Sequence, residues 1–105
     1  MIEAIFFSKS EKLVGFNVKG HSGYAEAGFD IVCSAVSSAS YLTANTITEV
    51  LKIPANVTVN DGDMELHIDI KNADACKTIL EGFRLHLVSL GEQYKKYIHV
   101  KFTEV

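Results

Sequence analysis

One histidine and one cysteine stand on either side of a glycine-containing stretch, and together they could perform nucleophilic chemistry. His21 follows Gly20, and Cys33 lies within the run Asp30-Ile31-Val32-Cys33. A thiol becomes a good nucleophile when its thiolate is stabilised, and a nearby imidazole or a helix N-terminus does this. Cys33 is therefore the candidate nucleophile, and His21 is the candidate general base and acid.

The residues around Cys33 indicate the start of a helix. Asp30 is a suitable N-cap because its carboxylate can accept the free N–H groups of a first turn, and orienting His21 is its second possible role. Cys33 would then be the third helical residue, where the helix dipole favours an anion. The backbone N–H groups of Cys33 and Ser34 would be the natural oxyanion donors. Ser37, one turn later, either lines this site or only packs the helix.

The stretch 20–29 contains three glycines and no hydrophobic period, which predicts a loop. We expect this loop to be open without substrate and to close over a bound one, with Gly23 and Gly28 as hinges and its aromatic residues lining an apolar groove. The residues assigned to this substrate loop are Ser22, Gly23, Tyr24, Gly28 and Phe29.

The other cysteine and histidines favour structural roles. Cys76 lies on the apolar stripe of a predicted helix, as expected for a buried and unreactive thiol. His67 and His99 alternate with apolar residues, so both are expected on a solvated sheet face. His86 lies beside a core stripe, which predicts partial burial or a position at a subunit contact.

No metal or cofactor is expected. Cys33, His21 and Asp30 carry donor atoms, but the chain has no CxxC or HxxxH spacing, and zinc sites normally need three or four ligands. The sequence also has no phosphate-binding or dinucleotide-binding motif.

Length and charge restrict the possible classes of protein. The 105 residues, 48% of them hydrophobic, predict a single domain over residues 1–105. The net charge is −3 and the ten basic residues are scattered, so nucleic acid and anionic membrane are not expected as primary partners. No secretory signal or membrane span is visible. We therefore expect a cytoplasmic protein with two reduced thiols.

Hydrophobic periodicity and turn signals predict the element order ββαββαβ. Such an order is typical of an α+β fold with two helices packed on one face of a mixed or antiparallel sheet. Strands are expected over Ile2–Ser8, Lys12–Lys19, Val57–Val59, Met64–Ile70 and Tyr97–Thr103, and helices from Asp30 to about Lys52 and from Ala73 to about Gln93.

Two blocks, Gly20-His21-Ser22-Gly23-Tyr24-Ala25 and the run from Asp30 to Ser37, resemble the signature of the ribosomal-processing cysteine protease family, Prp. The resemblance extends over almost the whole chain, because length and element order also agree. It implies a homodimeric bacterial cysteine endopeptidase with His21 and Cys33 as the catalytic dyad. Its substrate would be the precursor of a large-subunit ribosomal protein. Removal of a short N-terminal extension would let the mature N-terminus enter the ribosome's catalytic centre, a step in ribosome biogenesis.

Three other functions remain open at this point. A non-catalytic, ribosome-associated binding module would keep its function when Cys33 is replaced by alanine. A thiol redox sensor would need a resolving cysteine, and Cys76 on a core stripe is poorly placed for that role. A different Cys-dependent hydrolase would act on small esters but not on the ribosomal precursor.

Overall fold

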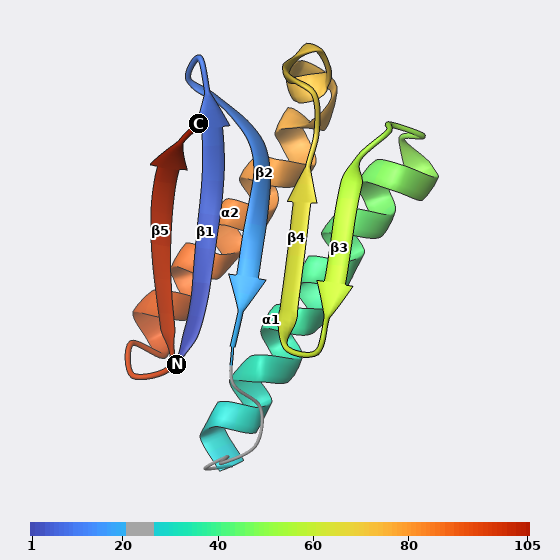
Figure 1. The fold of residues 1–105 in the computed structure, drawn as a ribbon. Helices are drawn as coiled ribbons and strands as arrows, with labels where there is room; N and C mark the ends of the chain where they lie inside the picture. The colour runs from blue at the N-terminus through green and yellow to red at the C-terminus, as the bar shows by residue number, and fades with distance from the viewer. Residues whose placement is uncertain (21–26) are drawn as a thin grey trace.

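The computed structural model describes residues 1–20 and 27–105 and contains a five-stranded mixed sheet (Figure 1). Its strands are β1 (Ile2–Lys9), β2 (Lys12–Lys19), β3 (Asn56–Asn60), β4 (Asp63–His67) and β5 (Ile98–Glu104). They lie in the order β3-β4-β2-β1-β5. The pairs β1–β2, β2–β4 and β3–β4 are antiparallel, whereas β5 runs parallel to β1.

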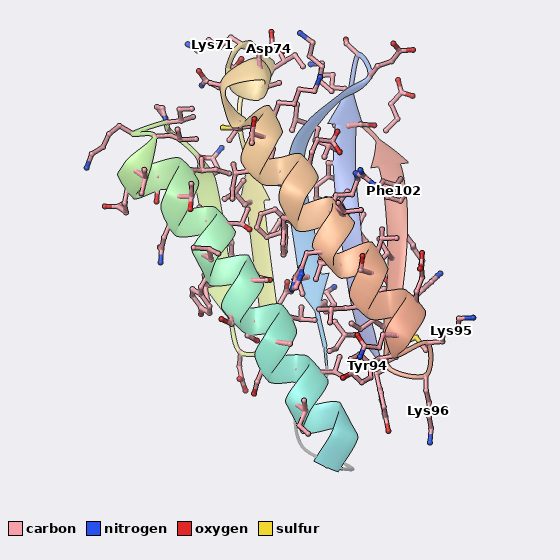
Figure 2. The ribbon with its side chains drawn as sticks, turned by 180° about the vertical axis from the view of Figure 1, so that it is seen from behind. Lys71, Asp74, Tyr94, Lys95, Lys96 and Phe102 are labelled. Carbon is pink, nitrogen blue, oxygen red and sulfur yellow. The ribbon has the colours of Figure 1, made fainter. Side chains whose placement is uncertain are left out.

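Two long helices lie against the same face of this sheet (Figure 2). The first, α1 (Ala27–Asn45), continues directly into the π-helical turn η1 (Thr46–Val50). The second, α2 (Ala73–Gln93), follows the short 3-10 turn η2 (Ile70–Asn72). The predicted α+β class and the ββαββαβ order are thus confirmed.

The core lies between the sheet and the helices, and strand alternation decides which side chains enter it. Phe6 of β1 and Phe16 of β2 are both fully buried and meet Phe83 of α2, with ring centroids 5.5 and 4.8 Å from it. The buried stripe of α2 comprises Ala73, Cys76, Leu80, Phe83 and Leu87.

Turn residues explain why most of the observed strand ends agree with the predicted ones. Asp61 and Gly62 connect β3 to β4, and Gly62 has a φ of 70°, a conformation that glycine adopts without strain. The predicted strand over Met64–Ile70 was too long, because β4 ends at His67. The reason is local: the Asp69 side chain accepts the Lys71 N–H at 2.9 Å and starts the 3-10 turn.

A buried amide holds the β3–β4 hairpin against β2. Asn17 is 6% exposed, and its Nδ2 donates to Asp63 Oδ1 at 2.8 Å and to the Met64 carbonyl at 3.3 Å. A Cβ atom on Gly15 would lie 2.1 Å from the Leu66 carbonyl oxygen, so β2 approaches β4 closely only with glycine there. This side of the sheet forms one wall of the site described below.

None of the helices in residues 1–20 and 27–105 combines the length and the hydrophobicity that a membrane span requires.

Candidate active site at Cys33

Cys33 lies on α1 and contributes to a pocket of about 130 Å³ between this helix and one end of the sheet. The thiol-bearing residue is half-buried, and it packs against the hydrophobic core. Neither Cys33 nor Cys76 is in a disulfide. A half-buried thiol at the wall of a pocket can meet a bound ligand, which a fully buried thiol cannot.

The pocket has a helical wall and a sheet wall, and most of its lining is apolar or small. The helical wall holds Cys33, Val36, Ser37, Ser40 and Tyr41. The sheet wall holds Ile2, Val18 and Gly20 at the ends of β1 and β2, with Val59, Asn60, Gly62, Asp63 and Met64 from the β3–β4 hairpin. Segments far apart in the sequence therefore meet around Cys33.

The end of β2 is fastened to this hairpin at the pocket. Gly20 donates its backbone N–H to the Gly62 carbonyl oxygen at 2.9 Å. Gly20 is the last described residue before His21 in the sequence, so the strand that leads to the candidate base ends at the pocket of the candidate nucleophile. His21, Ser22, Gly23 and Tyr24 themselves lie outside the described residues.

The predicted start of the helix was wrong. Helix α1 begins at Ala27, so Asp30 is its fourth residue and not its N-cap, and Cys33 is the seventh residue instead of the third. Ala27 is a strong helix former and one glycine in a helix costs only about 1 kcal/mol, so the local capping signal of Asp30 does not decide where the helix begins. Gly28 and Phe29 consequently belong to α1 and not to the predicted loop.

This earlier start changes the electrostatics expected at Cys33. The effect of the helix dipole is confined to the first turn, and Cys33 lies beyond it. The backbone N–H groups of Cys33 and Ser34 are within the i to i−4 ladder of α1, so they are not the oxyanion donors that the sequence suggested.

Ser34 and Ser37, the two serines that the sequence assigns to the site, differ in position. Both are exposed, but only Ser37 lines the pocket in the described part of the chain. Residues four apart on a helix are neighbours on one face, which places Ser37 next to Cys33. The nearby Ser40 hydroxyl is already used, because it donates to the Val36 carbonyl at 2.7 Å.

The other described histidines lie away from this pocket. His67 is on the sheet face that carries no helix, where it is stacked on Phe7 with ring centroids 4.8 Å apart. Its Nε2 lies 2.9 Å from a Glu65 carboxylate oxygen. His99 is exposed, as expected. His86 is also exposed, because it lies outside the buried stripe of α2. Its predicted partial burial was therefore wrong, and the alternative position at a subunit contact stays a prediction.

Cys76 has the environment that the sequence predicted. It is completely buried on α2, and burial raises the pKa of its thiol by disfavouring the charged form. A neutral, inaccessible thiol is a poor nucleophile, so only Cys33 combines a thiol with a pocket in the described structure.

In residues 1–20 and 27–105, no three His, Cys, Asp or Glu side chains are grouped as metal ligands would be.

Sequence reasoning missed the contribution of the hairpin to the pocket. The Asp61-Gly62 pair is itself a local turn signal, but no local signal relates Val59 or Gly62 to Cys33. Tyr41 was also missed, although its position two turns after Cys33 on α1 was available from the helical period.

The chain is similar to known proteins over most of its length. A family model described as cysteine protease Prp matches residues 1–99. The ribosomal processing cysteine protease Prp of Staphylococcus aureus is 25% identical over 93 residues, which cover 87% of this chain and 88% of that protein.

Solved structures share the fold over nearly the full length. SMU.848 from Streptococcus mutans has a TM-score of 0.89 and 28% identity, with 100% of this chain and 96% of that chain covered. A Prp protease from S. aureus in complex with a substrate peptide has a TM-score of 0.88 and 23% identity, covering 98% and 100% of the two chains. Because the family model covers almost the whole chain, this protein belongs to the Prp family of cysteine proteases.

Proposed function

We propose that this chain is an endopeptidase that removes the short N-terminal extension of a large-subunit ribosomal protein, with Cys33 and His21 as its catalytic dyad. The observation that carries the proposal is the pocket shared by Cys33 and Gly20, the residue directly before His21. The name of the S. aureus relative, a ribosomal processing protease, supports the choice of substrate class.

The proposed reaction has two halves. His21 accepts the thiol proton of Cys33, and the sulfur attacks the carbonyl carbon of the scissile peptide bond. The tetrahedral intermediate collapses as the C–N bond breaks, and His21 gives its proton to the departing amine. Water then attacks the thioester while His21 takes one of its protons, and cleavage of the C–S bond releases the new carboxylate and regenerates Cys33.

In this proposal His21 is the main stabiliser of the thiolate. Cys33 is the seventh residue of α1, so the helix N-terminus stabilises a thiolate at this position only weakly. An imidazolium next to the sulfur can supply that stabilisation directly. The stability of the Cys33 thiolate then depends strongly on the position of His21, and hence on the conformation of the segment after Gly20.

Ser37 is the proposed oxyanion donor from the described residues. Its hydroxyl group is on the same helix face as Cys33, it is exposed, and it lines the same pocket. A side-chain hydroxyl can donate a hydrogen bond to the oxyanion where the backbone N–H groups are already bonded within a helix.

The test is cleavage of a peptide that spans the extension junction of the ribosomal protein encoded in the same genome, read by mass spectrometry. Wild type and Cys76→Ala are expected to cut one bond, whereas Cys33→Ala is expected to cut none. Cutting by Cys33→Ala would exclude Cys33 as the nucleophile. No cutting by folded wild type would instead favour a non-catalytic, ribosome-associated binding module.

We further propose that the enzyme acts as a homodimer in the cytoplasm, where its ribosomal substrate is made. Two large apolar side chains support a protein contact: Leu85 on α2 is 59% exposed, and Phe102 on β5 (labelled in Figure 2) is 57% exposed. Light scattering should give twice the mass of the chain for wild type and a lower mass for Phe102→Ser. A monomeric wild type would refute the dimer.

A further inference from the structure

The outer edge of β3 is open and leads into the Cys33 pocket. β3 is the last strand of the sheet on its side, and no other strand of residues 1–20 and 27–105 pairs with its outer edge. All five of its residues are exposed. Val59 and Asn60, at its C-terminal end, line the pocket that contains Cys33.

Two hydrogen bonds show which backbone groups of β3 face outward. Gly20 donates to the Gly62 carbonyl, and Ile68 donates to the Val14 carbonyl, both at 2.9 Å. Hydrogen-bonded and non-hydrogen-bonded pairs alternate along an antiparallel ladder. Gly62 and Ile68 flank β4 and bond to β2, so the even-numbered residues of β4 bond to β2 and its odd-numbered residues bond to β3. In the β3–β4 register the odd-numbered residues of β4 stand opposite Asn56, Thr58 and Asn60.

It follows that the N–H and C=O groups of Val57 and Val59 point away from the sheet. This pairing agrees with the two-residue turn, since the residues that flank such a turn, Asn60 and Asp63, form a hydrogen-bonded pair. A second chain that lies along β3 would find two donors and two acceptors at the spacing of a strand.

The side chains of the same two valines provide an apolar surface beside this edge. Their partners on β4, Leu66 and Met64, are 0% and 6% exposed, so both pairs face the helical side of the sheet. Val57 is nevertheless 39% exposed and Val59 is 50% exposed, so part of each side chain remains accessible. Tyr41 of α1, which is 49% exposed, lines the same pocket as Val59.

We propose that the substrate peptide binds by strand addition to β3, with backbone hydrogen bonds to Val57 and Val59, and thereby brings its scissile bond to Cys33. This inference rests on the proposed function and adds how the peptide is held. A protease must take its substrate in extended form, and an edge strand that continues into the nucleophile's pocket is suited to that form. Alternate side chains of the peptide would point toward Tyr41 and the two valines.

The test compares two variants at Val57, which does not line the Cys33 pocket. Val57→Pro removes the outward N–H but suits an edge strand, while Val57→Ile keeps that N–H and an apolar, β-branched side chain. With the extension-junction peptide, Val57→Pro should give a KM up to about tenfold above that of Val57→Ile, with a similar kcat, as for one lost hydrogen bond. Equal KM values for the two variants, with cleavage intact, would overturn strand addition and leave the proposed function standing.

Amide hydrogen exchange provides a second test of strand addition, and it needs no substitution in β3. In Cys33→Ala bound to the uncut peptide, the amides of Val57 and Val59 should gain protection, whereas those of Thr58 and Asn60 are already held by β4. No gain at the valines in the bound state would refute the proposal. A lower molecular mass of Val57→Pro without peptide would assign the edge to a second copy of the chain instead. If the peptide neither binds nor is cut, the proposed function fails, and strand addition fails with it.

Discussion

Gly20 and Gly62 are joined by a backbone hydrogen bond of 2.9 Å that ties the end of β2 to the β3–β4 turn. Gly62 has a φ of 70°, and a Cβ atom at this position would lie 2.6 Å from the Gly20 carbonyl oxygen. The two glycines thus hold one wall of the Cys33 pocket at the point where the chain leaves β2 toward His21.

Gly62→Ala should therefore damage both stability and catalysis. The positive φ and the close Gly20 oxygen predict a loss of about 1–3 kcal/mol in the free energy of unfolding. The matched control is Gly82→Ala on α2, where an added Cβ would meet no atom within 4 Å, and this change should stabilise the helix by about 0.5–1 kcal/mol. Denaturant unfolding measures both. Cleavage by folded Gly62→Ala at the wild-type rate would show that this wall does not position the dyad.

Ser37→Ala should lower kcat for the junction peptide by about tenfold or more, since an oxyanion donor acts mainly in the transition state. KM should change little. Ser34→Ala is the control, because Ser34 is also exposed on α1 but does not line the pocket. Steady-state kinetics of the two variants give the comparison, and similar kcat values would remove Ser37 from the mechanism.

Replacement of each histidine by glutamine should separate the proposed base from the other three. We expect His21→Gln to reduce kcat/KM about 10²–10⁴-fold, the usual contribution of a general base and acid. His67→Gln, His86→Gln and His99→Gln should cut the peptide at nearly the wild-type rate, because all three lie outside the described lining of the pocket. A loss of activity confined to any of those three would assign the base elsewhere.

Because of Cys76, the free energy of unfolding should fall as the solution becomes alkaline. Burial raises the pKa of its thiol in the folded state, so the unfolded chain loses this proton first as the pH rises above about 8.5. The unfolded state then binds fewer protons, and stability falls by up to about 1.4 kcal/mol per pH unit. Urea unfolding of Cys33→Ala between about pH 8 and 9.5 should show this slope, and the Cys33→Ala, Cys76→Ala double variant should lack it. Equal slopes would mean that Cys76 ionises alike in both states.

Local patterns were sufficient to predict most of the fold. Alternation in β1 and β2, the Asp61-Gly62 turn and the apolar stripe of α2 follow from the two periods of side-chain direction and from turn chemistry, which act over a few residues. The same local logic predicted the burial of Cys76, since its neighbours on the stripe are apolar. The family signature identified His21 and Cys33 as candidate catalytic residues, because the two sequence blocks that contain them can be recognised from residue types alone.

Only the tertiary structure determined where α1 begins and what surrounds Cys33. Helix starts depend on small differences in free energy that packing can reverse, so Asp30 became the fourth residue of α1 despite its capping chemistry. The pocket joins α1 to a hairpin that follows Cys33 by more than twenty residues, and the open edge of β3 depends on the strand order of the whole sheet. Such relationships arise from long-range strand pairing and packing, and therefore no local sequence pattern records them.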